Sequence, residues 1–215
     1  MANDCKVKHR RYEQVAEKAR ELRRWLGIDM LYTFDITKQI ERLVGKTFGK
    51  LGMLHIDVFE DEKEDLAFVT FQPIFTLHVH KEIWLDARRG EPKSRFILAH
   101  ELGHILLHSY YRLAFSDDER RHLTFVPEEE RAETQANWFA EQFLAPDHLA
   151  RNCQKELDLC LQFDFPGAYA ASRMMRLRNR RVTFVGEACP NCGSYTLIRN
   201  GIESKCDTCG AMMCS

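Results

Sequence analysis

The sequence lacks three features, each of which would assign the protein to a class. Lys and Arg number 31 and Asp and Glu number 32, so the 215-residue chain has a formal net charge of only -1. This balance gives no general signal for binding to nucleic acids or membranes. No stretch approaches the roughly 18 apolar residues of a membrane span. The start, M-A-N-D-C-K-V-K-H-R-R, is polar and no apolar run follows it, so we expect no signal peptide and a cytoplasmic protein.

The expectation of a cytoplasmic protein determines how the eight cysteines are interpreted. In a reducing compartment, cysteines are more often metal ligands or free thiols than disulfide partners. Four of them form two C-x2-C pairs separated by thirteen residues: Cys189, Cys192, Cys206 and Cys209. This spacing is typical of a structural zinc site. Cys214 is an additional cysteine that could replace Cys209.

The segment between these pairs indicates a small β-structure. Asn200-Gly201 is the preferred dipeptide of a two-residue hairpin turn, and it lies between two short stretches with strand character. Two cysteine pairs and a hairpin resemble a zinc ribbon. A piece of about 30 residues has too small a core to fold without its metal. We therefore predict two domains, one at 1–185 and a zinc ribbon at 186–215.

Hydrophobic periodicity predicts an α+β fold for the larger domain. Helices are expected at 12–26, 35–44, 92–108, 127–145, 147–161 and 166–178. Strands are expected at 54–58, 66–71, 76–80 and 83–85, and they would form a small, mostly antiparallel sheet. His78 and His80 share one face of their strand, which we interpret as a polar sheet face and not as metal ligands. The helix at 147–161 should place four residues in the core: Leu149, Cys153, Leu157 and Cys160.

The stretch R-F-I-L-A-H-E-L-G-H-I-L-L-H at 95–108 carries the strongest chemical signal, H-E-x-x-H. In a helix, His100 and His104 lie one turn apart on one face, where two imidazoles can bind the same zinc ion. Glu101 lies beside that face, where it can take a proton from a zinc-bound water. Apolar residues surround the motif, so we expect a buried helix. Gly103 inside it indicates close packing against another element.

A catalytic zinc commonly takes three protein ligands and leaves one position for water. The helix expected at 127–145 offers the third ligand. Glu133 is the candidate because it borders the apolar stripe of this helix, and Glu129 and Glu130 are the alternatives. Asn137 lies one turn after Glu133 and could hydrogen-bond a zinc-bound imidazole or orient Glu133.

His108 is a further histidine on the helix expected at 92–108. It lies eight residues after His100, whereas the third histidine ligand of a metzincin lies ten residues after the first. We therefore expect His108 to support the ligands or to face the substrate, and not to bind zinc itself; the alternative is a buried histidine with a purely structural role. An oxyanion would need a further hydrogen-bond donor. The sequence does not choose among four residues for this role: His108, Tyr110, Tyr111 and His122.

The two helices together resemble the ImmA/IrrE metallopeptidase family, which is gluzincin-like. H-E-L-G-H-I-L-L-H is followed at 133–146 by E-T-Q-A-N-W-F-A-E-Q-F-L-A-P, which is similar to the family pattern E-x-x-A-N-x-F-A-x-x-x-L-x-P. The spacing also resembles the gluzincin pattern E-x-x-x-D, with Asn137 in place of the aspartate. The resemblance implies a zincin-like fold, Glu101 as the base, and three zinc ligands: His100, His104 and Glu133.

The resemblance further implies a cytoplasmic zinc endopeptidase that hydrolyses a regulatory protein, such as a helix-turn-helix repressor or an antitoxin. An alternative function comes from the basic segment R-M-M-R-L-R-N-R-R at 173–181. Together with the ribbon, this segment could contact nucleic-acid phosphates in a metal-dependent regulator that performs no proteolysis. We expect two zinc ions in the chain, one catalytic and one structural.

Overall fold

The computed structural model describes residues 6–48, 52–60, 66–71, 74–108 and 127–179, and the shorter C-terminal stretches 190–191, 197–200, 203–206 and 211–214. The chain divides into two compact units, Met1–Arg173 and Met174–Ser215. The boundary predicted between residues 185 and 186 lies outside the described residues and stays a prediction. Within the described part of the chain, no helix is both long and apolar enough to cross a membrane.

Two helices open the first unit, and both agree with the sequence prediction. α1, Tyr12–Leu26, is followed by Gly27 with φ 72°, a left-handed conformation that favours glycine. α2, Ile36–Leu43, begins after Asp35, whose carboxylate accepts hydrogen bonds from the backbone N–H groups of Thr37 and Lys38. The predicted apolar stripe of α1 is buried: Val15, Ala19, Leu22 and Leu26.

The sheet of the first unit has three strands in the order β1–β3–β2. These are β1, His55–Phe59; β2, Ala67–Thr70; and β3, Thr76–His80. β2 is antiparallel to β3, but β1 is parallel to it, so the prediction of a mostly antiparallel sheet is wrong. Residue alternation along one strand carries no information about the direction of its neighbour. His78 lies 2.9 Å from both Asp57 and Thr70, which confirms the interpretation of a polar sheet face.

The prediction of a fourth strand at 83–85 is also wrong, because these residues belong to the helix α3, Lys81–Arg89. The ring of His80 accepts a hydrogen bond from the backbone N–H of Glu82 and caps the start of this helix. Ile83, Trp84 and Ala87 are buried at helical spacing. The apolar stretch is too short for its period to be recognised from the sequence alone.

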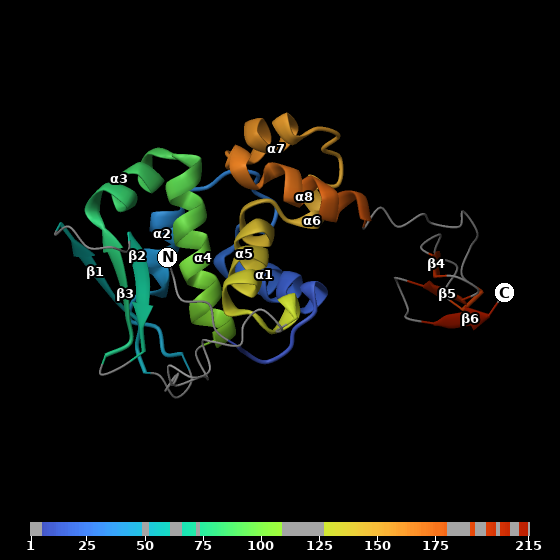
Figure 1. The fold of residues 1–215 in the computed structure, drawn as a ribbon, viewed down its shortest axis with the longest axis horizontal. Helices are drawn as coiled ribbons and strands as arrows, with labels where there is room; N and C mark the ends of the chain where they lie inside the picture. The colour runs from blue at the N-terminus through green and yellow to red at the C-terminus, as the bar shows by residue number, and fades with distance from the viewer. Residues whose placement is uncertain are drawn as a thin grey trace. The chain divides into compact units, whose positions relative to one another are not determined.

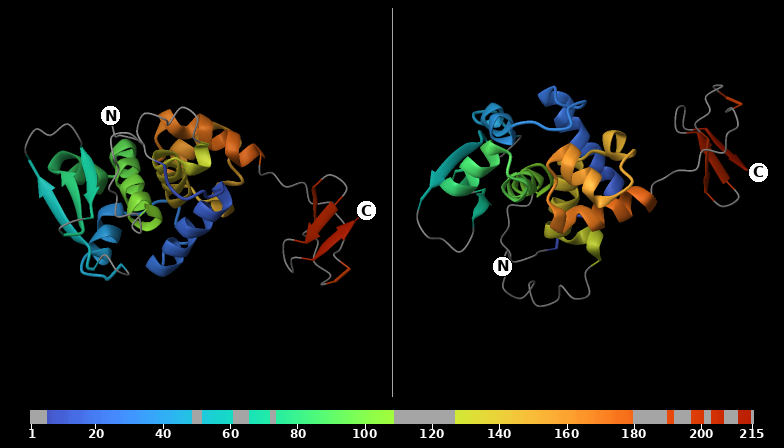
Figure 2. Two further views of the ribbon diagram at one scale, coloured as in Figure 1. Left: turned by 60° about the horizontal axis from the view of Figure 1, so that its bottom comes forward. Right: turned by 90° about the horizontal axis from the view of Figure 1, so that it is seen from above.

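The helix α4, Pro92–His108, occupies the middle of the first unit and has the predicted bounds. The sheet and α3 lie on one side of α4, and α1 and α5, Ala132–Leu144, lie on the other (Figures 1 and 2). α5 is shorter than predicted because Glu128–Glu130 form a separate 3-10 turn, η3. Arg131 between them is extended, with φ -97° and ψ 128°, and forms a β-bridge with Lys6.

Three shorter helices follow α5. They are α6, Asp147–Ala150; α7, Glu156–Phe163; and α8, Gly167–Asn179. The single helix predicted at 147–161 is therefore two helices. Leu149 and Cys153 are buried as predicted, but Leu157 is 61% exposed and Cys160 is only partly buried. In α7 the buried residues are Leu159 and Phe163, because that helix presents a different face to the core.

The second unit contains a sheet of three antiparallel strands: β4, Leu197–Asn200; β5, Glu203–Cys206; and β6, Met212–Cys214. Asn200 pairs with Glu203, so Asn200 belongs to the strand ladder and not, as predicted, to the hairpin turn. Cys189, Cys192 and Cys209 lie outside the described residues, and only the backbone of Cys206 is described. The predicted ribbon metal site therefore stays a prediction.

Candidate metal centre

The candidate centre lies where α4 packs against α5, and the sequence of both helices allows this close approach. Gly103 is buried in α4. A Cβ atom added to it would lie 3.0 Å from the Cα and 3.1 Å from the carbonyl oxygen of Ala136 on α5. Glycine and alanine thus face each other at the crossing point, which confirms the expected close packing. Two predicted site residues lie beside this contact: His104 follows Gly103 on α4, and Asn137 follows Ala136 on α5.

Three predicted ligands converge at one point. The Nε2 atoms of His100 and His104 are 2.9 Å apart. The Glu133 carboxylate approaches both, with Oε2 at 3.1 Å from His100 Nε2 and Oε1 at 3.3 Å from His104 Nε2. Bonds of about 2.0–2.1 Å to a tetrahedral zinc would place neighbouring ligand atoms about 3.3 Å apart. Two imidazoles and one carboxylate in this arrangement fit a divalent cation.

The electrostatics of the cluster favour positive charge. Although burial disfavours an ionised carboxylate, hydrogen bonds with His100 and His104 hold the pKa of Glu133 well below its usual range. Burial likewise disfavours a charged imidazole, but the hydrogen bond to Glu133 and the charge of Glu101 raise the pKa of His100. In the metal-free protein the cluster therefore attracts a proton. The same field would attract a divalent cation. The bound proton must leave the cluster before the cation can bind.

Two predicted supporting residues contact the histidines. The Nδ1 atom of His100 lies 2.9 Å from the side-chain oxygen of Asn137. The Nδ1 atom of His104 lies 3.1 Å from Nδ1 of His108, which is 2% exposed. Burial, together with the neighbouring His104, lowers the pKa of His108 to about 3, so its imidazole is neutral. Both contacts have the arrangement that orients a metal-binding imidazole in other proteins.

One residue of the site, Gln135, was not identified from the sequence. It is fully buried on α5, and its side-chain oxygen lies 3.2 Å from Nε2 of His108. Its amide group donates to the backbone carbonyls of Lys8, at 2.8 Å, and Glu129, at 2.6 Å. No feature of the sequence could have indicated Gln135, because its role depends on contacts with His108 on another helix and with Lys8, which is 127 residues away.

The remaining predicted residues divide into three cases. Glu101 is buried on α4, directly after His100, and is 8% exposed. The alternative ligands Glu129 and Glu130 belong to η3 and are not part of the described cluster, and the carboxylate of Glu130 lies 3.2 Å from the ammonium of Lys6. The other candidate oxyanion donors lie outside the described residues: Tyr110, Tyr111 and His122.

Comparison with known proteins places this site in a family. Residues 54–160, from the residue before β1 into α7, match the model of the IrrE N-terminal-like domain, Peptidase_M78. A stretch of 28 residues is 57% identical to a vitamin B12-dependent ribonucleotide reductase of Bradyrhizobium diazoefficiens. That stretch covers 13% of this chain and 2% of the reductase, so it carries no argument about activity. No solved structure matches the chain. The family match contains both helices of the His100, His104 and Glu133 cluster, and through residues 54–160 the chain belongs to the Peptidase_M78 family of metallopeptidases.

Proposed function

We propose that the protein is a zinc-dependent endopeptidase that cleaves a regulatory protein. The observation that carries this proposal is the convergence of three ligand atoms, one each from His100, His104 and Glu133, within 4.8 Å of one another. They come from two helices inside the segment that matches a peptidase family. A set of two imidazoles and one carboxylate leaves one tetrahedral position for water or substrate, as in catalytic zinc sites.

The chain would contribute binding and proton transfer. A divalent cation at the cluster would polarise a peptide carbonyl and lower the pKa of a nearby water towards about 7. Glu101 is buried next to His100 and can accept a proton from that water. The water oxygen forms the new bond to the peptide carbon. Glu101 then returns the proton to the leaving nitrogen as the peptide C–N bond breaks.

The position of the sheet supports a peptide as substrate. β2 is at the edge of the sheet, beside α4 (Figure 1). An extended segment that pairs with β2 would therefore pass alongside the helix that carries His100 and Glu101. Backbone pairing of this kind recognises an unfolded stretch of protein more readily than a small molecule. The choice of a repressor or antitoxin-like protein as substrate rests on the resemblance of the sequence to ImmA/IrrE peptidases.

A second, structural zinc is proposed for the C-terminal unit. Its support is the spacing of Cys189, Cys192, Cys206 and Cys209, together with antiparallel backbone pairing of β4 and β5 between the two cysteine pairs. Elemental analysis of the purified chain should then find two zinc ions, of which a moderate chelator removes one first. Substitution of Cys192 by serine should remove the other.

The non-proteolytic alternative is less well supported. Its basic segment begins with Arg173, but this side chain is fully buried. The guanidinium donates to the carbonyl of Ala145 at 2.6 Å and contacts the carboxylate of Asp147 at 2.7 Å. Arg173 therefore serves the core and is not free to bind a phosphate. Arg180 and Arg181 lie outside the described residues.

The experiment that tests the proposal compares the zinc-loaded protein with its Glu101→Gln variant. Each is incubated with helix-turn-helix repressors and antitoxins encoded near its gene, and new N-termini are identified by mass spectrometry. Glu101→Gln should retain the zinc and the fold but cleave at least about 100-fold more slowly, since it loses the proton acceptor. Cleavage by the variant at the wild-type rate would contradict the role of Glu101. Absence of metal-dependent cleavage by the wild type, with DNA binding in both proteins, would favour the alternative.

A further inference from the structure

We propose that Gln135 and His108 are positioning residues that hold His104 in the tautomer whose Nε2 lone pair points at the metal centre. The proposal rests on the proposed metal site but goes beyond its ligand set. It assigns a role to a buried glutamine that no motif identifies. It also makes the N-terminal segment, through Lys8 and Arg10, part of the support of the centre. A chain of hydrogen bonds connects these residues, and each contact determines the next.

The first step is the orientation of the Gln135 amide. Its Nε2 atom faces two backbone carbonyls, those of Lys8 and Glu129, and a carbonyl can only accept a hydrogen bond. Its Oε1 atom lies 3.3 Å from Nη1 of Arg10, and a guanidinium can only donate. Three contacts therefore agree on which end of the amide is nitrogen and which is oxygen. The oxygen of Gln135 is the atom directed at His108.

The second step is the tautomer of His108. Because Oε1 of Gln135 is an acceptor, the Nε2 atom of His108 at 3.2 Å must carry the proton and donate it. A neutral imidazole has only one N–H group, so the Nδ1 atom of His108 carries a lone pair. This Nδ1 atom is directed at His104, one helical turn earlier on α4.

The third step is the tautomer of His104. Its Nδ1 atom lies 3.1 Å from the Nδ1 lone pair of His108, so His104 donates from Nδ1. The Nε2 atom of a neutral His104 is then unprotonated, and its lone pair points at the cluster with His100 and Glu133. A metal binds imidazole through such a lone pair, and the partner of the other ring nitrogen decides which nitrogen is available.

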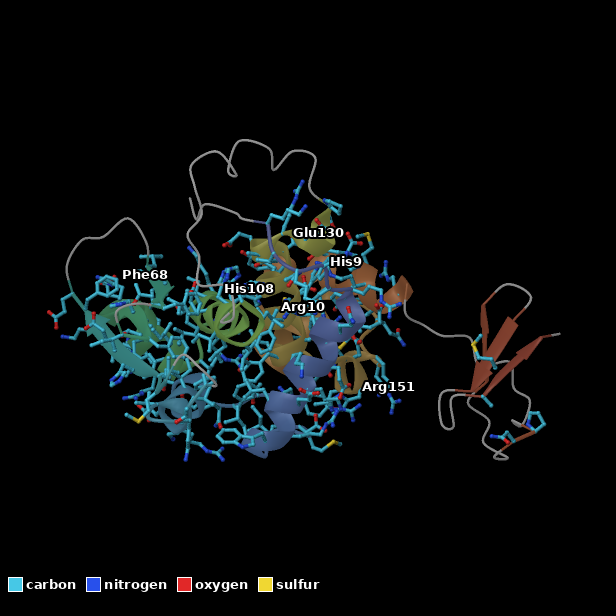
Figure 3. The ribbon with its side chains drawn as sticks, turned by 90° about the horizontal axis from the view of Figure 1, so that it is seen from below. His9, Arg10, Phe68, His108, Glu130 and Arg151 are labelled. Carbon is cyan, nitrogen blue, oxygen red and sulfur yellow. The ribbon has the colours of Figure 1, made fainter. Side chains whose placement is uncertain are left out.

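The N-terminal segment anchors the far end of this chain. The backbone N–H of Val7 donates to the carbonyl of Glu130 at 2.7 Å, and that of Arg10 donates to the carbonyl of Glu129 at 3.0 Å. These bonds hold the segment against η3, where Lys8 and Arg10 reach Gln135. Figure 3 labels Arg10 and His108, the two residues that contact the Gln135 oxygen from different elements. His100 is supported differently: its Nδ1 atom lies 2.9 Å from the side-chain oxygen of Asn137 on α5.

The test uses three variants and a matched control in the full-length protein. Gln135→Met removes the amide and keeps the length of the side chain. His108→Leu removes the acceptor for His104, whereas His108→Asn keeps an oxygen near the position of Nδ1. The control is Gln142→Met: Gln142 is also buried on α5, but it bonds Tyr12 and Asp147 instead of the histidines. A purely structural role of a buried glutamine would make both glutamine variants behave alike.

Two measurements are made on each protein. The zinc affinity of this centre is measured from the ring resonances of His100 and His104 in zinc solutions buffered by nitrilotriacetate. Because only these histidine resonances are followed, zinc bound at a thiolate site does not contribute to the signal. Long-range 1H–15N spectra show which ring nitrogen carries the proton. We expect Gln135→Met and His108→Leu to weaken zinc binding by about 10-fold or more. His108→Asn and Gln142→Met should remain within a few-fold of the wild type, and His108 should show an Nδ1–H tautomer only in Gln135→Met.

The outcomes separate this inference from the proposed function. If wild-type His100 and His104 do not respond to zinc, the metal centre itself is wrong and the inference with it. If the wild type binds zinc but Gln135→Met binds it equally well, only the inference fails. Equal losses in Gln135→Met and Gln142→Met would also overturn it, since they would reflect general destabilisation. A His104 ring protonated at Nε2 in the zinc-free wild type at neutral pH, with Nδ1 bare, would contradict the chain directly.

Discussion

Two buried polar regions lie within the helices of the first unit, and they are constructed in opposite ways. In the first, donors meet acceptors: three buried arginines, Arg23, Arg95 and Arg173, donate to backbone carbonyls. In the second, between α4 and α5, one ring nitrogen from each of two histidines and the carboxylate of Glu133 face one another. The arginine side chains are fully buried, and carbonyl groups accept from their guanidinium groups, although the Nε atoms of Arg23 and Arg95 have no hydrogen-bond partner. The side chains of His100, His104 and Glu133 are 16%, 18% and 25% exposed, and their converging atoms offer one position for a proton or a cation.

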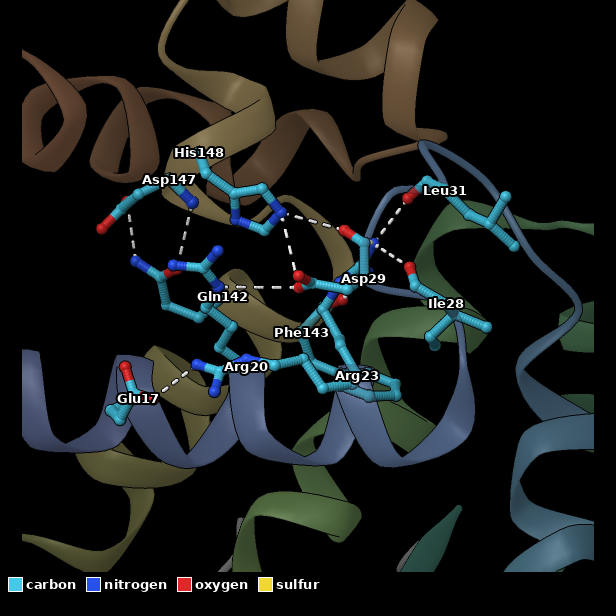
Figure 4. A network of polar contacts seen from close by, with 11 residues as sticks. Glu17, Arg20, Arg23, Ile28, Asp29, Leu31, Gln142, Phe143, Asp147 and His148 are labelled. Carbon is cyan, nitrogen blue, oxygen red and sulfur yellow. Dashed lines mark hydrogen bonds and ion pairs between the residues drawn. The ribbon is translucent and has the colours of Figure 1, made fainter.

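The arginine region joins the ends of helices. Arg23 donates to the carbonyl of Phe143 near the end of α5 at 2.6 Å and to that of Ile28 after α1 at 2.7 Å (Figure 4). Arg95 donates to the carbonyl of Phe163, the last residue of α7, at 2.8 Å. Helix C-termini present unpaired carbonyls and a negative dipole end, which a cation stabilises. Burial lowers the pKa of Arg23 to about 10, so it remains charged at neutral pH.

The difference separates a structural cluster from a binding site. Burying a charge is unfavourable unless its hydrogen bonds are satisfied, and carbonyl groups supply acceptors for the arginines. In the histidine cluster, one atom each from His100, His104 and Glu133 converges on one point, where a bound proton can be exchanged for a cation. We therefore expect changes in the arginine region to act on folding, and changes in the histidine cluster to act on metal binding. The following predictions test this division, beginning with the largest effect.

Arg173→Met should destabilise the protein by about 3–5 kcal/mol. The substitution leaves the carbonyl of Ala145 without its buried donor and removes one of the donors to the carboxylate of Asp147, which still accepts from Gln142. The side chain of Asp147 is 33% exposed and can regain some water, so we expect the lower end of the range. Urea unfolding measures the loss. Arg151→Met is the control, because Arg151 is exposed, and it should change stability by less than about 0.5 kcal/mol.

The division would be wrong if Arg173→Met changed zinc affinity as strongly as it changes stability. It would also be wrong if the variant lost less than about 1 kcal/mol, which is the effect of one ordinary hydrogen bond. Zinc affinity should be compared under conditions in which the variant is fully folded.

Removal of metal should have the next largest effect. A ligand at a free concentration of 100 times its Kd stabilises the folded state by about 2.7 kcal/mol. Chelation should therefore lower the unfolding free energy by about this amount. The loss should be the same in the wild type and in Arg173→Met, because changes in separate regions contribute additively to stability. The three tryptophans, Trp25, Trp84 and Trp138, all belong to the first unit, so their fluorescence reports its unfolding and not that of the C-terminal unit. Equal stability with and without zinc would show that the cluster binds no ion.

The contrast also explains which features could be predicted from the sequence. Local patterns sufficed for α1, β3 and α4, whose bounds agree with the predictions, because periodicity, a following glycine and an early proline mark them. His100 and His104 could be paired because both belong to one helix. Glu133 could be proposed because its helix has a recognisable apolar stripe. Each of these inferences needs only residues within a few turns of one another.

Features that depend on distant partners could not be predicted. The β-bridge of Arg131 with Lys6 interrupts a helix that the run of acids after Pro127 predicts as continuous. The parallel pairing of β1 with β3 depends on how the chain returns across the sheet. Gln135 joins the N-terminal segment to His108 across more than a hundred residues of sequence. The sequence does not distinguish the three buried arginines from arginines at the surface. Only their contacts with backbone carbonyls show that they stabilise the core.

The smallest effect on folding, and a distinct effect on the site, is expected for Gly103→Ala. Alanine favours a helix over glycine by about 1 kcal/mol. The new Cβ, however, would lie 3.0 Å from Cα and 3.1 Å from the carbonyl oxygen of Ala136, and 3.1 Å from Cβ of Phe139. Because two of these atoms are backbone of α5, the helices must separate by a few tenths of an ångström. Overpacking costs about 1–3 kcal/mol, so we expect a net loss near 1 kcal/mol.

The same displacement should weaken zinc binding, because it moves Glu133 on α5 away from His100 and His104 on α4. The matched control is Gly167→Ala in the first turn of α8, where a Cβ would meet no atom within 4 Å. That variant gains helix propensity without a clash. Its stability should therefore not fall, and its zinc affinity should equal that of the wild type. If Gly103→Ala instead binds zinc as tightly as Gly167→Ala does, the two helices tolerate separation at their crossing point. The ligand geometry would then not depend on the close α4–α5 contact, which is the one feature of the histidine region that the protein builds by packing alone.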